Sequence, residues 1–307
     1  MTANRTEDYY FRVGGPGTAE DRIARELGRD IESALVRLGL FGRVFWRTKS
    51  GHSIAATLGK KRAVYLANGR KMQDLFGVRV ALYFADDSEV AQAVVRSRYE
   101  FDSESIDSPA QSIFGPTRCN LVFRLPESLA QQSDLIRREP LIDPTFEVQF
   151  RTVLSEGWHE VEHDLRYKRP EDWGTHADLD RALNGIMATL ETCDWSMLKI
   201  FDDLAWRHYK AGAYEALIQA KFRLRLQGDG RLAPEIVELF RSDTDLVKAL
   251  FRVERATLLR KMIAVDIDLP LTAPNVLYFC NRLFIGDVRL SALEPAPIAQ
   301  LLDRYTA

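Results

Sequence analysis

Residues 146–168, FEVQFRTVLSEGWHEVEHDLRYK, join a strand pattern directly to a helix pattern. In the first part apolar and polar side chains alternate, which predicts a strand over 146–151 with Glu147, Gln149 and Arg151 on one face. In the following part apolar residues recur at spacings of three and four, which predicts a helix. A strand face that carries an acid, an amide and a guanidinium is either a solvated face of an antiparallel sheet or the floor of a polar site.

In the residues that precede this stretch, strand and helix patterns alternate along the chain, which predicts an α/β domain. Beyond residue 170 the spacing is mostly helical. We expect three parts: a flexible arm at 1–18, a mixed sheet flanked by helices over 19–170, and a helical C-terminal region over 171–307. The predicted strands are 44–46, 78–84, 120–125 and 146–151, the predicted helices 18–38, 50–62, 88–98 and 153–167, and the predicted polar connections 102–117 and 126–144.

The composition is that of a soluble globular protein. The 307 residues are 46% hydrophobic, and 42 Lys and Arg against 44 Asp and Glu leave a net charge of −2, which argues against a nucleic-acid or membrane partner. No run of 18 apolar residues suggests a membrane span, and the N-terminus lacks the apolar stretch of a signal peptide. Three widely spaced cysteines argue against a disulfide framework. We therefore expect a cytoplasmic protein.

Positive charge is concentrated between Arg43 and Arg79. This segment holds nine basic residues and one acid, Asp74, so its net charge is +8. Such a block is either a solvated basic face or a binding site for a polyphosphate. Asp74, just before a predicted buried strand, and Glu147 together could hold magnesium, which accepts one or two carboxylates along with substrate phosphates. The combination is typical of metal-assisted phosphoryl transfer.

A second metal hypothesis comes from the predicted helix. His159 and His163 lie four residues apart with Glu160 after the first, which meets the zinc-protease spacing. No third ligand in a suitable context is evident in the sequence, so this remains the weaker alternative.

The residues quoted above resemble those of RelA/SpoT-type alarmone synthetases, especially the small single-domain enzymes. That family has an acid-x-Gln-x-Arg-Thr strand, then a helix with Trp and Glu-His, then Tyr-Lys, as at 146–168. Residues 47–53, RTKSGHS, resemble its Arg-x-Lys-Ser…Ser donor loop, and 74–80, DLFGVRV, resemble its Asp-x-x-Gly-x-Arg segment. The resemblance covers about residues 40–170. It implies a nucleotidyltransferase-like mixed sheet and transfer of a pyrophosphoryl group from ATP to the ribose 3′-hydroxyl of GDP or GTP.

The resemblance also implies roles for individual residues. Asp74 and Glu147 would hold Mg²⁺ and, with Arg151, form the catalytic set. Arg47 and Lys49 would hold ATP, with Arg47 able to stack on adenine. The other residues expected to bind ATP or phosphate are Ser53, Lys60, Lys61, Arg79, Gln149, His163 and Lys168.

The acceptor segment departs from the family pattern Lys-x-Asn-Gly-Tyr-x-Ser-x-His. The aligned residues 112–120, SIFGPTRCN, keep only Gly115 and place Pro116, Arg118 and Asn120 where the family has Tyr, Ser and His. Base stacking on an aromatic ring is worth about 1–3 kcal/mol, so guanine selectivity is expected to weaken. Two hypotheses follow: a transferase that uses a guanine nucleotide or a related acceptor such as an RNA end, and a catalytically silent module that senses nucleotides or binds a partner.

The C-terminal region carries apolar residues at helical spacing. Such stripes usually pack in a core or form an interface between copies of the chain, so a homo-oligomer through these helices is one expectation. The alternative is a regulatory cap over the active site. The residues concerned are Trp195, Leu198, Phe201 and Leu204, and then Leu246, Leu250, Val253 and Leu258.

Overall fold

The computed structural model of this chain describes residues 17–106 and 119–306. Almost all of the predicted arm at 1–18, together with Pro116 and Arg118, therefore lies outside the described residues. The chain divides into two compact units, each built from segments that are separate in sequence. Unit 1 contains residues 1–33, 42–83 and 94–191, and unit 2 contains 34–41, 84–93 and 192–307. The last division falls between Glu191 and Thr192, whereas the sequence pattern changes character at about residue 170.

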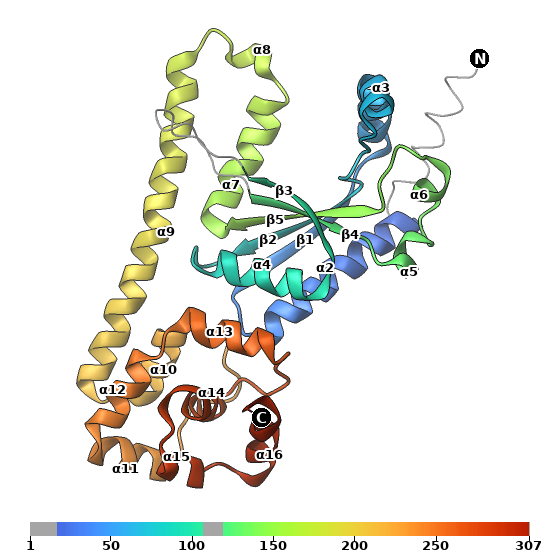
Figure 1. Cartoon of the computed structure of the whole chain (residues 1–307). Coiled ribbons are helices and arrows are strands. Elements are labelled where there is room, and N and C mark those ends of the chain that lie inside the picture. Colours follow the sequence, from blue (N-terminus) through green and yellow to red (C-terminus); the bar gives the residue numbers. More distant parts are fainter. Residues whose placement is uncertain (1–16, 107–118, 307) are drawn as a thin grey trace. The chain divides into compact units, whose positions relative to one another are not determined.

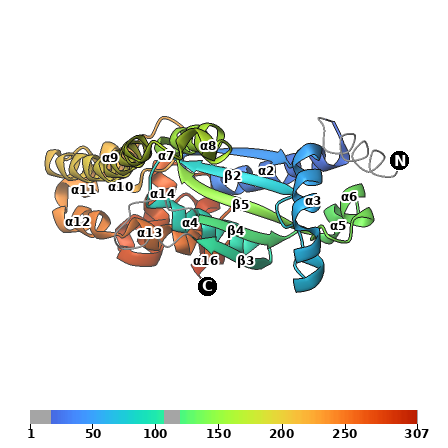
Figure 2. The same ribbon diagram turned by 90° about the horizontal axis from the view of Figure 1, so that it is seen from above.

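Unit 1 contains a mixed five-stranded sheet with the strand order β1-β2-β5-β4-β3. Figure 1 labels all five strands, and Figure 2 shows β2, β5, β4 and β3 side by side in this order. β2 and β5 run parallel, and the other neighbouring strands are antiparallel. The predicted mixed sheet flanked by helices is thus confirmed. The strands are β1 (Gly42–Thr48), β2 (Phe76–Leu82), β3 (Phe101–Ile106), β4 (Cys119–Arg124) and β5 (Thr145–Thr152).

The two faces of this sheet differ in chemistry because side chains alternate along each strand. On the apolar face Val78, Phe146 and Val148 are buried. Helix α2 (Ala19–Arg37) packs closely there, since a Cβ atom on Gly28 would lie 2.4 Å from the Trp46 ring. The opposite face, called the polar face below, carries Arg43, Phe45 and Arg47 of β1, Arg79 of β2, Asn120 of β4, and Glu147, Gln149 and Arg151 of β5.

The turn from β5 into the next helix needs no loop. Thr152 ends the strand, and its side chain accepts the N–H of Ser155 while the Ser155 hydroxyl accepts the N–H of Thr152, a capping box that starts α7 (Val153–Glu162). Acidic side chains of α7 reach arginines of the polar face. The helix predicted over 153–167 is correct in place but changes at His163 to a π-helical turn, η1 (His163–Tyr167).

Other helices of unit 1 flank the sheet. Helix α3 (Gly51–Asn68) has Ser50 as its N-cap. Its C-cap is Gly69, whose backbone adopts the left-handed conformation that favours glycine. This helix stands at one end of the sheet (Figures 1 and 2). The remaining elements are α4 (Asp87–Arg98), whose first part belongs to unit 2, the short helices α5 (Glu127–Ala130), α6 (Asp134–Arg138) and α8 (Pro170–Trp173), and α9 (Ala177–Ala211), which continues into unit 2.

Two predicted connections were wrong in part. Residues 101–106, FDSESI, form the edge strand β3, although the segment was predicted to lie in a polar loop. An edge strand pairs on one side only, here with β4, so it needs few apolar residues and lacks the pattern of a buried strand. The connection at 126–144 contains α5 and α6; Ser133 caps α6 by accepting the N–H of Ile136.

Unit 2 is helical within its described residues. The second predicted stripe is core, since Leu246, Leu250, Val253 and Leu258 are all buried. The first is divided: Leu198 is buried, but Trp195 is 66% exposed. Among the helices that the structure describes, none combines the length and the apolar character needed to cross a bilayer. The elements are α10 (Tyr214–Phe222), α11 (Pro234–Ser242), α12 (Thr244–Arg252), α13 (Arg255–Ala264), α14 (Ala273–Cys280), η2 (Asn281–Ile285), α15 (Val288–Ala292) and α16 (Ala296–Thr306).

Candidate active site

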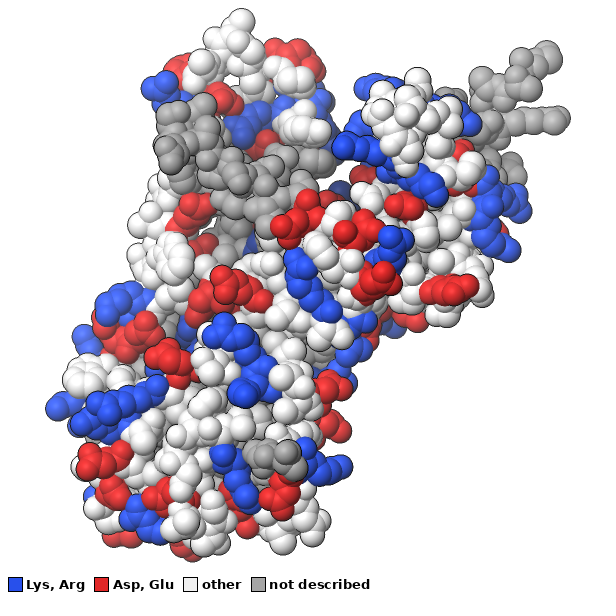
Figure 3. Space-filling view, viewed as in Figure 1, with Lys and Arg blue, Asp and Glu red and all other residues white. Residues whose placement is uncertain are grey.

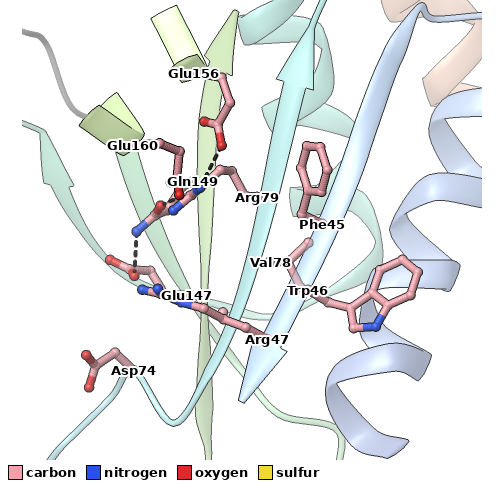
Figure 4. A pocket seen from close by; sticks show the side chains of 11 residues that line it. Phe45, Trp46, Arg47, Asp74, Val78, Arg79, Glu147, Gln149, Glu156 and Glu160 are labelled. Carbon is pink, nitrogen blue, oxygen red and sulfur yellow. Dashed lines mark hydrogen bonds and ion pairs between the residues drawn. The ribbon is translucent and has the colours of Figure 1, made fainter. Parts of the chain in front are cut away.

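A cavity of about 450 Å³ lies on the polar face of the sheet, between the strands and α7 (Figure 4). This volume is typical of small-molecule sites. Three strands, one helix and the loop before β2 supply its walls. The lining residues are Phe45, Trp46, Arg47, Asp74, Gly77, Val78, Arg79, Glu147, Gln149, Glu156 and Glu160.

Two carboxylates from distant parts of the sequence lie near each other in this cavity. Burial raises the pKa of Glu147, and the negative charge of Asp74 raises it further. Gln149 opposes this shift, because its Nε2 donates a hydrogen bond to Glu147 Oε2 at 3.0 Å. Arg47 and Asn120 also lower the pKa of Glu147. On the other side, Lys49 Nζ donates to Asp74 Oδ2 at 2.5 Å. Both carboxylates thus line the same cavity, and the charge of Asp74 acts on Glu147.

This arrangement fits a magnesium ion. Burial is the main cause of the raised pKa of Glu147, and a divalent cation between Asp74 and Glu147 would offset both the buried charge and the added effect of Asp74. Within the described ranges no group of three or more His, Cys, Asp or Glu side chains is placed to hold a metal ion. Two protein carboxylates suit Mg²⁺, which takes its other ligands from water and substrate phosphates. The described residues give the zinc pattern no third ligand: His159 is buried beside Trp158, and His163 is exposed.

We expect Glu147→Gln to raise stability at neutral pH in magnesium-free buffer. Because the folded-state pKa of Glu147 is raised, the folded protein binds this proton more tightly than the unfolded chain, and stability falls as pH rises through the interval above the ordinary pKa. Glutamine removes the buried charge, so the free energy of unfolding should increase by about 1 kcal/mol at pH 7. Thermal unfolding in EDTA measures this gain in stability. An equal gain at a pH well below the ordinary pKa of glutamate, where Glu147 is protonated in both the folded and the unfolded protein, would contradict the explanation.

Arg47 crosses the floor of the cavity. It stands opposite Gly77 in the β1–β2 register, and a Cβ atom on that glycine would be 3.6 Å from Arg47 Cγ. With no side chain at Gly77, the guanidinium extends over β2 toward Glu147 (Figure 4). Trp46, the preceding residue, points to the apolar face, where its ring lies beside Gly28 of α2. Arg47 is thus placed beside the carboxylate pair.

Two further arginines of the polar face, Arg79 and Arg151, are held by acids of α7. Arg79 Nη1 donates to Glu156 Oε1 at 2.6 Å and also pairs with Glu160. Its Nε donates to Gln149 Oε1 at 3.3 Å. Arg151 Nη1 donates to Glu156 Oε2 at 3.1 Å. Burial and the nearby charge of Arg79 lower the pKa of Arg151. Neither glutamate was predicted to pair with an arginine: Glu160 was named only in the zinc pattern, and Glu156 was not named, although the two lie four residues apart on the helix that follows β5.

Most of the predicted site residues come together. The cavity lining includes Arg47, Asp74, Arg79, Glu147 and Gln149. Lys49 adjoins it through Asp74, Arg151 through Glu156, and Asn120 through Glu147. In the sheet Asn120 stands opposite Gln149, so the described end of the acceptor segment borders the same floor.

Five of the predicted residues that the structure describes neither line nor adjoin this cavity. Ser53 bonds to Ser50 at the start of α3. Lys60 and Lys61 are exposed on α3, where Lys and Arg side chains gather in the space-filling view (Figure 3). His163 Nδ1 and Lys168 Nζ both contact Asp164, at 3.0 and 2.7 Å. Their roles toward a substrate remain predictions, as do those of Pro116 and Arg118, which lie outside the described residues.

Residues 46–172 match the family model described as the region found in RelA / SpoT proteins. The chain carries a RelA/SpoT region. This region runs from β1 to α8 and contains every lining residue of the cavity except Phe45, which precedes it by one position. No curated protein matches the chain.

Several solved structures are similar to part of the chain. Small alarmone synthetase 1 from Bacillus subtilis, bound to its product pppGpp, is 19% identical over 61% of this chain and 95% of that one, with a TM-score of 0.45. Protein smu.1046c from Streptococcus mutans UA159 is 22% identical over 60% and 93%, with a TM-score of 0.45. A GTP pyrophosphokinase family protein from Streptococcus pneumoniae is 22% identical over 66% and 95%, with a TM-score of 0.45.

Proposed function

We propose that the RelA/SpoT region transfers a pyrophosphoryl group from ATP to a ribose hydroxyl of a guanine nucleotide or a related acceptor such as an RNA end. The observation that carries the proposal is the carboxylate pair: Asp74 and Glu147, which are far apart in sequence, line one cavity together with Arg47. The match of residues 46–172 to the RelA/SpoT family supports the same class of reaction.

Each group has a distinct task in this proposal. Bound Mg²⁺ would be held by Asp74 and Glu147 and would offset negative charge on the phosphates. Arg47 and Lys49 bind and orient the triphosphate, since guanidinium and ammonium groups pair with phosphate oxygens. The acceptor hydroxyl loses its proton to water and its oxygen forms a bond to the β-phosphorus of ATP, the bond from that phosphorus to the α–β bridging oxygen breaks, and AMP leaves with that oxygen.

A direct assay tests this function. The purified chain is incubated with γ-labelled ATP, magnesium and one of GDP, GTP, ATP or tRNA. We expect AMP to form together with a labelled product for at least one acceptor. If ATP binds but no acceptor gives AMP, the chain is a silent nucleotide-sensing module.

One observation favours that second candidate. Arg79 is already paired with Glu156 and Glu160, so a phosphate must displace an acid before this guanidinium can bind it. A site that holds its own arginine in this way suits regulated binding of a nucleotide. Glu160 is the acid to displace, because its side chain is 50% exposed whereas that of Glu156 is largely buried.

We expect Glu160→Gln to raise the affinity for a non-hydrolysable ATP analogue by about tenfold. The change removes one negative charge from Arg79 and leaves the Glu156 pair in place, and charge-assisted pairs of this kind are worth about 1.5–3 kcal/mol. Isothermal titration calorimetry measures the affinity. Glu171→Gln, an exposed acid of α8 that does not line the cavity, is the matched control. Equal affinities for the two variants would show that Glu160 does not compete with phosphate.

A homo-oligomer through the C-terminal helices is also part of the proposal. Trp195 and Ile200 of α9 are exposed large apolar side chains, which an interface between copies would cover. Sedimentation equilibrium distinguishes a 35.0 kDa monomer from a dimer.

A further inference from the structure

An exposed aromatic ring forms one wall of the cavity. Phe45 lies in the middle of β1 on the polar face, lines the cavity and is 51% exposed. Single exposed apolar side chains are common on protein surfaces. Phe45 differs from such side chains in two ways. Its backbone is fixed by the pairing of β1 with β2, and its ring stands beside charged groups inside a concave site (Figure 4).

The neighbours of Phe45 are cations. In the antiparallel register Phe45 stands directly opposite Arg79, so their Cβ atoms are close enough for the side chains to touch a common ligand. Arg47 lies two residues further along the same face of β1. A flat ring between two guanidinium groups suits a nucleobase, since bases stack both on aromatic side chains and on guanidinium planes.

The direction of β1 also fits a nucleotide. Lys49 follows the strand by one residue and contacts Asp74. At about 3.3 Å per residue, Phe45 and Lys49 are separated by about 13 Å, similar to the extended length of a nucleoside triphosphate. A ligand laid along β1 would therefore place its base at Phe45 and its outer phosphates beside Lys49 and the carboxylate pair.

We propose that Phe45 is a stacking platform for the purine base of the nucleoside triphosphate and so a specificity-determining residue of this site. The inference rests on the proposed function, because it takes the ligand to be a nucleotide. It adds a residue that lies outside the region matched by the family. The larger ring system of a purine covers more of the phenyl ring than a pyrimidine does, so ATP should bind more tightly than CTP or UTP.

The test compares a ligand that has a base with one that has none. Calorimetry in magnesium measures the binding of a non-hydrolysable ATP analogue and of inorganic tripolyphosphate. We expect Phe45→Ala to weaken binding of the analogue by about tenfold and to leave tripolyphosphate binding within about twofold. Phe45→Trp should retain the affinity for the analogue, and quenching of its fluorescence should report the stacking. Phe284→Ala is the control, because Phe284 is also exposed, at 38%, but belongs to unit 2.

Each outcome decides a separate point. Equal weakening of both ligands by Phe45→Ala, or no weakening of either, overturns the role of Phe45 while the phosphate site stands. The role of Phe45 is also overturned, and the phosphate site retained, if the wild-type protein binds the ATP analogue no better than tripolyphosphate. If wild-type protein binds neither ligand, the proposed function itself is wrong and the stacking role is wrong with it. Should Phe45→Ala fail to fold, Phe45→Leu gives the same comparison with an apolar side chain that lacks the ring.

Discussion

Glu147→Gln is expected to lower the rate of pyrophosphoryl transfer by about 10³-fold without loss of the fold. A bound metal contributes several kcal/mol of charge stabilisation in the transition state, and about 4 kcal/mol corresponds to that factor. Glutamine has the size of glutamate and still accepts the hydrogen bond from Gln149, so the change removes charge rather than packing. Single-turnover release of AMP measures the rate. Glu32→Gln, an exposed acid on α2, should keep the wild-type rate.

Asp74→Asn provides an independent test of the same pair. We expect a similar loss of rate, with partial recovery as magnesium is raised, because a neutral amide oxygen is a weaker ligand than a carboxylate. Lys49 should also be freed by this change, since Asp74 is its ion-pair partner. If either variant keeps its rate within threefold of the wild type at ordinary magnesium concentration, the carboxylate pair does not hold the metal.

The part of the site that could be predicted from sequence is the part that strand periodicity determines. Alternation alone placed Glu147, Gln149 and Arg151 on one face of β5, and the structure has them there. The meeting of Asp74 with Glu147 required the pairing of β2 with β5, which periodicity does not give. The position of Asp74 just before a predicted buried strand raised this pair as a hypothesis, and the resemblance to the RelA/SpoT family implied the same two residues.

The features that the sequence did not predict depend on tertiary pairing. Glu156 and Glu160 are ordinary acids of an amphipathic helix until the capping box at Thr152 turns α7 so that they meet Arg79. Phe45 reads as one apolar residue in a short strand, and only the β1–β2 register shows that its ring faces a cavity and not the core. β3 was missed because a polar edge strand is specified by its partner more than by its own residues.

Removal of one member of a buried ion pair should have the largest effect on stability, and unit 2 contains such a pair. Asp87, at the start of α4, is 0% exposed, and Arg255, at the start of α13, is 7% exposed; Arg255 Nη1 contacts Asp87 Oδ1. The Nε of Arg255 also donates to the carbonyl of Phe222 at 2.6 Å. Next to them, Arg223 forms two hydrogen bonds with Asp86, at 3.1 and 2.5 Å. These contacts join three segments of unit 2.

We expect Asp87→Ala to lower the free energy of unfolding by about 3–5 kcal/mol, because Arg255 then keeps a buried charge without its partner. Urea unfolding followed by circular dichroism measures the loss in the transition that includes unit 2. Lys199→Ala breaks an exposed pair with Asp203 in the same unit and should cost at most about 0.5 kcal/mol. The double variant Asp87→Leu with Arg255→Met should regain most of the stability, since the stranded charge, rather than the attraction within the pair, accounts for the loss. If the double variant were as unstable as Asp87→Ala, hydrogen bonds such as that from Arg255 to Phe222 would be the stabilising contacts.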